Sequence, residues 1–419
     1  MTLKLLGRRF ESFQGALARQ AKAWRLGGGS AVEARFVEVE DLYRELTAGD
    51  AKASRRDVVM VATDWFPTLI ATGRLLCLDP YLHARPPADW PEDWAPSLRL
   101  LQCDAGGRCY GAPYHDGPEM LMYRRDLFED EDERRRYLEV HGRPLVPPAT
   151  WTEFRDVARF FTRTGRQLYG TVLATFPDAH NIIYDFLLQL WSRGGEVLGA
   201  DGFPSFHEPA GVQGLRFLRE LLHEARVTPP DCSTVDSVEA GQRFAAGQVA
   251  MMVNWAGFAA LAQSGPSSRV RGAVGWAPPP GLAAGGGCSL NVYWCLAIPA
   301  DAVHPDEAWE FIRWCGSANM DRVTTEAGAI GVRRSTWRDP SFAGGHGFEV
   351  FDRLHAIARH LPRTPAWGPM SEVLNGQLDA ALNRGADPQT ALCSAARECT
   401  QILRAEGGLP GEGPRPGGE

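Results

Sequence analysis

The hydrophobic pattern of the first third of the chain alternates between two periods. Residues 3–7 and 57–64 are short apolar runs typical of buried strands, and residues 32–39 are mostly apolar as well. Between these runs, residues 11–24 carry apolar side chains at helical spacing and residues 40–46 form a shorter helical segment. This βαβαβ order predicts an α/β fold with a doubly wound, mostly parallel sheet.

The remainder of the chain continues to mix helices and strands. One helix is predicted to begin at Thr152, which we interpret as its cap. Further helices are predicted over residues 181–193, 211–223, 304–315, 348–360 and 371–406. Further strands are predicted over residues 120–123, 250–255 and 291–299. The tail, residues 408–419, is rich in Gly, Pro and Glu and is predicted to be disordered.

Composition limits the classes of protein that this chain can belong to. Its 419 residues suggest two domains, and 44% hydrophobic with 23% charged residues is an ordinary globular balance. A net charge of −7 disfavours nucleic acid as a partner. The sequence contains no run of 18 apolar residues, so we predict no membrane span. The opening MTLKLLGRRFESF is too short and too soon charged for a signal peptide, so we expect either a cytosolic chain or one that lacks its export signal.

The nine cysteines do not form a recognisable metal or redox motif. Their number is odd and no Cys-x-x-Cys occurs, which disfavours a zinc site. Cys103 and Cys109 bracket a short turn and would suit a disulfide in an oxidising compartment, although spacing alone does not fix the separation of their Cα atoms.

Motifs for catalysis are also missing. His115, Asp116 and Glu119 are candidates for a general acid/base cluster, but no nucleophile is paired with them by motif. No phosphate-binding loop, nucleophile elbow or metal-binding helix occurs, and the glycine runs do not follow a strand that enters a helix. We therefore predict that the chain is not an enzyme and has no catalytic residue, cofactor or metal.

A different pattern recurs at the ends of the predicted strands, where an aromatic residue accompanies a hydrogen-bonding side chain. The residues concerned are Asp64 with Trp65, Tyr114 with Asp116, Asn254 with Trp255, Asn291 with Tyr293, and Trp367 in a later loop. The chain also contains 13 tryptophans. Aromatic faces pack on the C–H faces of a sugar ring while carboxylates and amides bind its hydroxyls, so this pattern favours a sugar-binding cleft in which Trp65 is exposed.

The order of several motifs resembles one family, the extracellular solute-binding proteins of ABC transporters, in the sugar-binding group that includes maltose-binding protein. The motifs are DVVMVATDWF with ATGRLLCLDPYL, then YGAPYHDGPEMLMYRRDLF, FAAGQVAMMVNWAG and CLAIPADAVHPDEAWEFIRW. The resemblance extends from the first strand to about Leu403, and it implies a two-lobed periplasmic-binding-protein fold of type II, each lobe an open and mostly parallel sheet flanked by helices.

The same resemblance implies boundaries and further site residues. Residues 1–115 and 293–331 would form the first lobe, and residues 116–292 and 332–407 the second, with chain crossings near Asp116, Val292 and Val332. A carbohydrate ligand would bridge the lobes and stabilise their closure about the hinge. Carried over by position, the site would add Arg8, Arg9 and Asn181 to Asp64, Trp65, Tyr114, Asp116, Asn254, Trp255, Asn291, Tyr293 and Trp367.

The family implies a monomer that delivers its ligand to the permease subunits of an ABC transporter, in the periplasm or at the cell surface. Three alternatives stay open at this point. One is a cytosolic ligand sensor on the same fold. Another is a ligand of the glycerol-phosphate type, because Arg8, Arg9 and Arg333 suit a phosphate or carboxylate. The third is a carbohydrate hydrolase, which requires Asp64, Asp116 or Glu119 to form a carboxylate pair at glycosidase spacing.

Overall fold

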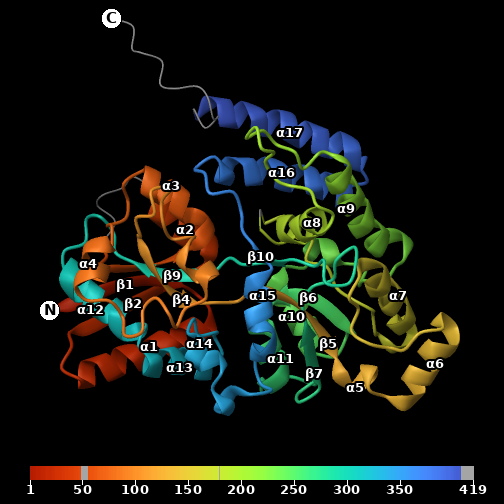
Figure 1. Ribbon diagram of the computed structural model, residues 1–419, viewed down its shortest axis with the longest axis horizontal. Helices are drawn as coiled ribbons and strands as arrows, with labels where there is room; N and C mark the ends of the chain where they lie inside the picture. Colours follow the sequence, from red (N-terminus) through yellow and green to blue (C-terminus); the bar gives the residue numbers. More distant parts are fainter. Residues whose placement is uncertain (49–54, 179, 407–419) are drawn as a thin grey trace, which may run out of the picture. The chain divides into compact units, whose positions relative to one another are not determined.

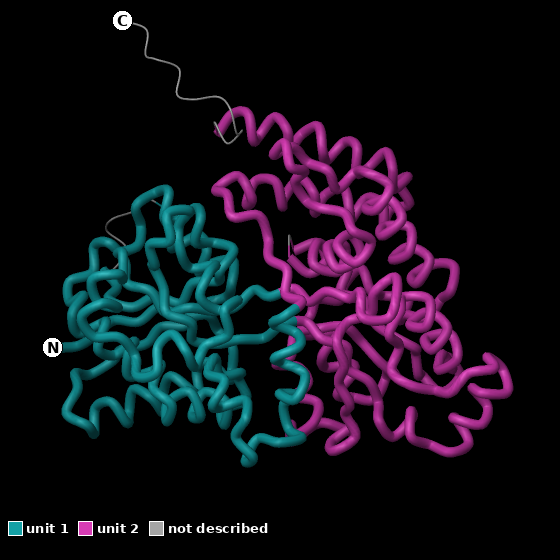
Figure 2. The backbone as a smooth tube through the Cα atoms, viewed as in Figure 1, with its two compact units in different colours: residues 1–118, 291–356 teal, residues 119–290, 357–419 magenta. Residues whose placement is uncertain are grey.

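The chain separates into two compact units, shown in different colours in Figure 2. The computed structural model describes residues 1–48, 55–178 and 180–406, so the predicted tail at 408–419 lies outside the described residues (Figure 1). Unit 1 comprises Met1–Pro118 and Asn291–Ala356, and unit 2 comprises Glu119–Leu290 and the chain from Ile357 onward. The chain therefore passes between the units after Pro118, after Leu290 and after Ala356.

Unit 1 is built on one five-stranded sheet. Its strands are β1 (Thr2–Arg8), β2 (Ala31–Val37), β3 (Val58–Ala62), β4 (Gly111–His115) and β9 (Trp294–Ala297). Its helices are α1 (Glu11–Leu26), α2 (Val39–Thr47), α3 (Phe66–Ala71), α4 (Asp79–Ala84), α12 (Pro305–Cys315), α13 (Ala318–Glu326), α14 (Arg334–Trp337) and α15 (Phe351–Ala356). All five residues of β3 are buried, as its continuous apolar run predicts.

The strand order of this sheet is β2-β1-β3-β9-β4. Strands β2, β1 and β3 are parallel, whereas β9 is antiparallel to both of its neighbours, β3 and β4. The sheet is thus mostly parallel, in agreement with the prediction, and four of its strands end at the same edge. Ligands of open α/β sheets tend to bind at this carboxyl edge.

The units differ from the predicted lobes mainly in residues 332–356, which we had expected in the second lobe and which the structure includes in unit 1. Arg333 explains the difference. It forms an isolated antiparallel bridge with Trp94, and its guanidinium donates to Asp93 Oδ2 and Asp89 Oδ2, at 2.7 and 2.9 Å. The other two crossings lie within three residues of the predicted boundaries at 115 and 292.

Unit 2 contains more helix and smaller sheets. Its strands are β5 (Glu119–Arg124), β6 (Met251–Trp255), β7 (Val274–Ala277), β8 (Ser289–Leu290) and β10 (Ala358–Arg359). Its helices are α5 (Arg125–Phe128), α6 (Glu131–His141), α7 (Trp151–Phe161), α8 (Asn181–Ser192), α9 (Pro209–Arg219), α10 (Ser237–Ala245), α11 (Ala256–Ser264), α16 (Trp367–Leu382) and α17 (Pro388–Ala405). Helix α7 begins one residue earlier than predicted, because Thr150 and Glu153 form a reciprocal capping box.

The main sheet of unit 2 is antiparallel, so the prediction of a mostly parallel sheet is wrong for this unit. Strand β5 lies at the centre of the order β6-β5-β7 and runs opposite to both neighbours. Strands β6 and β7 are joined through α11 and are parallel to each other, as expected of a crossover unit. Strand β5 enters between them from the first crossing of the chain and fixes the antiparallel pairing.

Helices α16 and α17 lie side by side at the end of unit 2, and α16 packs against α8 (Figure 1). We had predicted a single helix over residues 371–406. It is divided because Gly385 adopts a positive φ of 79° and the side chain of Asp387 caps a new helix at Pro388. In the part of the chain that the structure describes, no helix is both long and apolar enough to cross a membrane.

Candidate functional site

The carboxyl edge of the unit 1 sheet gathers several of the predicted site residues. Strand β1 ends at Arg8, and β3 is followed by a 3-10 turn over Thr63–Trp65. Strand β9 begins at this edge, since Trp294 is the register partner of both Ala62 and His115. We call Arg8, Asp64, Trp65 and Trp294 the unit 1 face.

Aromatic rings fix the geometry of this face. The ring centroids of Trp65 and Trp294 are 5.4 Å apart with the planes at 84°, and the Tyr43 ring lies 5.2 Å from that of Trp65. The Arg8 guanidinium lies 5.3 Å from the Trp294 ring and 5.5 Å from Phe10. Trp65 is only 5% exposed, so the prediction of an exposed indole is wrong, and the half-buried Asp64 is the more accessible residue of the turn.

Tyr293 supports this turn from within the core. Its backbone N–H donates to Thr63 Oγ1 at 3.2 Å and its carbonyl accepts from the Thr63 N–H at 3.0 Å. Its fully buried hydroxyl donates to Gln102 Oε1 and accepts the Leu101 N–H. We had expected Tyr293 to contact ligand; its hydroxyl is instead occupied inside unit 1.

Tyr114 is also a core residue, contrary to expectation. It is 3% exposed, and its hydroxyl donates to Gln20 Oε1 on α1 at 2.9 Å.

Two further predicted residues of unit 1 lie in different surroundings. Arg9 is exposed and forms an ion pair with Glu38 at 3.0 Å. Asn291 is 2% exposed, and neither its amide nitrogen nor its amide oxygen has a hydrogen-bond partner among the described residues.

His115 and Asp116 at the end of β4 do not form a joint acid/base site with Glu119, because each has its own partner in unit 1 and Glu119 belongs to unit 2. Burial lowers the pKa of His115 to about 3, and its Nδ1 accepts the Ile330 N–H at 2.9 Å, so the ring is neutral. Asp116 is fully buried, and its Oδ2 lies 2.9 Å from His355 Nε2. His355 Nδ1 lies 2.7 Å from Ser97 Oγ, and the ring stacks on Trp337 at 4.8 Å. This chain of contacts anchors the end of β4 to α15.

A second set of predicted residues lies at the start of α8 in unit 2. Asp178 caps this helix, since its Oδ1 accepts the N–H groups of His180 and Asn181 at 2.9 and 2.8 Å, and the Asn181 side-chain amide donates to its Oδ2. One turn on, the ring of Tyr184 meets Trp255 at the end of β6, 5.4 Å away at 86°. We call Asn181, Tyr184 and Trp255 the unit 2 face.

Two other predicted residues of unit 2 lie deeper. Asn254 is 4% exposed; its amide donates to the Ser237 carbonyl at 2.9 Å and its oxygen accepts the Trp255 N–H at 2.8 Å. Its side chain therefore orients Trp255. Trp367 is the first residue of α16 and is 4% exposed.

Sequence reasoning missed Asp178 and Tyr184, and it omitted Trp294 from the site although it is adjacent to Tyr293. A helical spacing of three residues from Asn181 to Tyr184 was the available signal. For Trp294 the signal was strand alternation, which places neighbouring side chains on opposite faces of the sheet.

A buried carboxyl pair lies beneath the unit 2 face. Glu119 is the register partner of Trp255, and Asp185 follows Tyr184 on α8. Burial raises the pKa of Asp185 to about 7, and burial with the nearby Asp185 charge raises the pKa of Glu119 well above its usual range. Glu119 Oε2 and Asp185 Oδ2 have no hydrogen-bond partner among the described residues.

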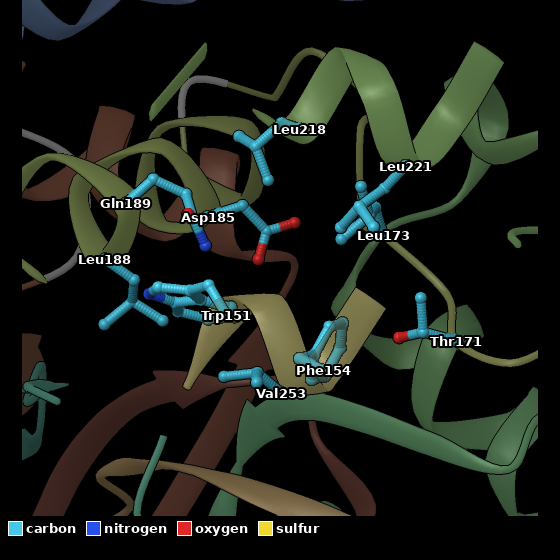
Figure 3. A pocket seen from close by; sticks show the side chains of 10 residues that line it. All are labelled: Trp151, Phe154, Thr171, Leu173, Asp185, Leu188, Gln189, Leu218, Leu221 and Val253. Atoms are coloured by element: carbon cyan, nitrogen blue, oxygen red, sulfur yellow. The ribbon is translucent and has the colours of Figure 1, made fainter. Parts of the chain in front are cut away.

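Figure 3 shows the Asp185 carboxyl among the side chains that line a small cavity between α7, α8 and α9. Its volume of about 10 Å³ is far below what a sugar needs, so it is not the solute site. A larger hollow of about 400 Å³ is lined by Trp191, Glu196 and Arg359 among others. Glu196 and Arg359 are paired at 2.5 Å, and none of the predicted site residues lines this hollow.

Residues 11–320 match the family described as bacterial extracellular solute-binding protein. The chain belongs to this family. Its members are binding proteins, which agrees with the prediction that the chain is not an enzyme. The family is described as extracellular.

Individual relatives are distant. A probable ABC transporter-binding protein of Deinococcus radiodurans is 25% identical over 401 residues, which cover 91% of this chain and 89% of the relative. A probable amino-acid ABC transporter periplasmic-binding protein of Sinorhizobium fredii is 26% identical over 197 residues, 47% of this chain and 43% of the relative. The chain thus spans between 43% and 89% of the length of these two relatives.

Solved structures confirm the fold. The maltose-bound T. maritima MalE3 gives a TM-score of 0.81 at 24% identity, covering 96% of this chain and all of that one. A solute-binding protein from Agrobacterium radiobacter K84 in complex with ribitol gives 0.83 at 23% identity, covering 96% and 98%. The predicted periplasmic-binding-protein fold is therefore confirmed.

Proposed function

We propose that this solute-binding protein captures a sugar or a related polyol outside the cytoplasm, as a monomer, and delivers it to the permease subunits of an ABC transporter. The unit 1 face carries this proposal. It carries the half-buried Asp64 carboxylate, which can accept hydrogen bonds from solute hydroxyls, on a turn that the buried Trp65 and Trp294 rings fix in place. Structures of the same fold hold maltose and ribitol, which supports the same ligand class here.

The unit 2 face has the same chemistry in different residues. Asn181 supplies an amide held by Asp178, and Trp255 supplies an indole held by Tyr184 and Asn254. Both groups are fixed before any ligand arrives, which reduces the entropy that binding must overcome. We propose Asp64, Arg8, Asn181 and Trp255 as the residues that touch the solute, with Trp65, Trp294 and Tyr184 positioning them.

Arg8 favours a second ligand class, an acidic or phosphorylated polyol. Its guanidinium lies within 5.5 Å of two aromatic rings, and a guanidinium recognises carboxylate and phosphate bidentately. An Arg8→Met variant separates the two classes. It would abolish binding of a charged solute but weaken a neutral sugar only about tenfold or less.

The test is thermal unfolding and tryptophan fluorescence with mono- and oligosaccharides, polyols, glycerol phosphates and amino acids. A solute at about a hundred times its Kd should add roughly 2.7 kcal/mol of stability. We expect the sugars or polyols to produce this shift. A shift with amino acids alone would contradict the proposal.

The Asp64→Ala variant should weaken binding of the active solute about 10- to 100-fold. The variant loses the hydrogen bonds that solute hydroxyls donate to the charged Asp64 carboxylate, and hydrogen bonds to a charged group are worth roughly 1.5–3 kcal/mol. Isothermal titration would measure the change. Asp41→Asn is the matched control, since the Asp41 side chain is 50% exposed in the same unit and pairs with Arg44 on its own helix. Equal affinity of Asp64→Ala and the control would remove Asp64 from the site.

A further inference from the structure

Cys103 and Cys109 face each other across a short hairpin of unit 1. They form an isolated antiparallel bridge. The flanking residues make the hydrogen bonds: Tyr110 N–H donates to the Gln102 carbonyl at 3.0 Å, and Asp104 N–H donates to the Arg108 carbonyl at 2.9 Å. The cysteines therefore occupy a non-hydrogen-bonded pair, where opposite Cα atoms lie about 4.5 Å apart. A disulfide accepts Cα separations of roughly 4.4–6.8 Å.

The two thiols are already in contact. The hydrogen bond that the Cys109 thiol makes with Cys103, together with burial, raises the pKa of Cys109 well above its usual range. Cys109 is 6% exposed, whereas Cys103 is half-buried and within reach of solvent. An external oxidant would thus meet Cys103 first, and Cys109 is in place to resolve the mixed disulfide.

The turn between the cysteines is held in shape by its own contacts. Asp104 Oδ1 accepts the Arg108 N–H at 2.9 Å and Asp104 Oδ2 accepts from Arg108 Nε at 2.7 Å. Gly107 has a φ of +82°, which a glycine adopts without strain. These contacts hold the two strands that carry the cysteines opposite each other.

We propose that Cys103 and Cys109 form a disulfide when the chain is in an oxidising compartment. Each thiol gives up its proton and the sulfurs together give up two electrons. A thiol–disulfide oxidant takes up both electrons and leaves as two thiols. The extracellular family places the chain where such bonds persist. The proposal does not depend on which solute is bound.

The bond would also stabilise the unit 1 face. Gln102, next to Cys103, accepts the Tyr293 hydroxyl and donates to the Leu98 carbonyl at 3.1 Å. Tyr293 in turn holds Thr63, the first residue of the turn that carries Asp64. The disulfide thus closes the loop that supports the solute-binding turn.

Peptide mapping tests the proposal directly. Tryptic cleavage after Arg99, Arg108 and Arg124 separates the two cysteines into peptides 100–108 and 109–124. After exposure of the native protein to oxidised glutathione, we expect these peptides to appear joined, at the sum of their masses less two hydrogens. They should separate on reduction. Free peptides after oxidation, or either cysteine joined to the nearby Cys295, would overturn the proposal.

Two variants and one control complete the design. Cys103→Ser should lose the joined peptide and should unfold at the same temperature under oxidising and reducing conditions. Wild-type protein should unfold on the order of 5 °C higher when oxidised than when reduced. Cys393→Ser, on the half-buried side of α17, should behave like wild type. Equal unfolding temperatures for oxidised and reduced wild type would refute the stabilising role.

Discussion

Replacing Arg333 by methionine is expected to lower the free energy of unfolding by about 3 kcal/mol, because it leaves the partly buried Asp93 carboxylate and two backbone carbonyls without their donor. The Arg333 side chain is 1% exposed. Nε donates to Asp93 Oδ2 at 2.7 Å and Nη1 donates to the Gly316 carbonyl at 2.8 Å. Nη2 donates to Asp89 Oδ2 and to the Ala88 carbonyl, and the guanidinium lies 4.4 Å from the centre of the Trp94 ring.

Chemical denaturation followed by circular dichroism would measure this loss. The adjacent Arg334→Met is the control, since Arg334 is partly exposed and pairs with the exposed Asp352 at 3.1 Å. An ion pair of that kind contributes roughly 0–1 kcal/mol. If the two variants were equally stable, Arg333 would not be the structural cation that its contacts indicate.

Arg333 also shows where sequence reasoning reached its limit. As one of three arginines it was a reasonable candidate for an anionic ligand, since nothing in its neighbours RRS marks it as buried. Its partners lie about 240 residues earlier in the chain. Such long-range pairing is invisible to local patterns, and it moved residues 332–356 from the expected second lobe into unit 1.

Local patterns predicted the regular elements well. The strand expected at residues 57–64 is β3, the helix expected at 181–193 is α8, and the helix expected at 304–315 is α12. The helix expected at 348–360 was wrong in its second half, because α15 ends at Ala356 and residues Ala358–Arg359 pair with β8 instead. Strand pairing of two residues leaves no periodicity to detect.

Local patterns predicted the positions of some candidate site residues but not their exposure. Asp64 and Trp255 follow strands, and a strand end is readable from hydrophobicity. Whether an aromatic residue there meets solvent or core is decided by distant partners. Gln20 and Gln102 take the hydroxyls of Tyr114 and Tyr293, and Tyr43 covers Trp65.

The pair Glu119 and Asp185 should make unit 2 less stable as pH rises. The folded-state pKa of Asp185 is raised from 3.8 to about 7 by burial, so the folded chain holds a proton that the unfolded chain has released. Stability is therefore unaffected below about pH 4 and falls as pH rises towards 7. Since a shift of one pKa unit corresponds to roughly 1.4 kcal/mol, the free energy of unfolding falls by up to about 4 kcal/mol. The pKa of Glu119 is raised as well, so the two carboxyl groups titrate as a coupled pair.

Asp185→Asn should abolish most of this loss, because a neutral amide keeps the acceptor for the Ala174 N–H without the buried charge. Denaturant unfolding between pH 4 and pH 8 should find the variant close to wild type at pH 4 and more stable by a few kcal/mol at pH 8. Asp132→Asn, with a side chain 74% exposed on α6, is the control and should follow wild type throughout. Parallel curves for wild type and Asp185→Asn would mean that Asp185 ionises freely in the folded protein. Since Glu119 pairs with Trp255 in register and Asp185 adjoins Tyr184, a difference between the curves would show that the unit 2 face rests on a carboxyl pair that retains a proton near neutral pH.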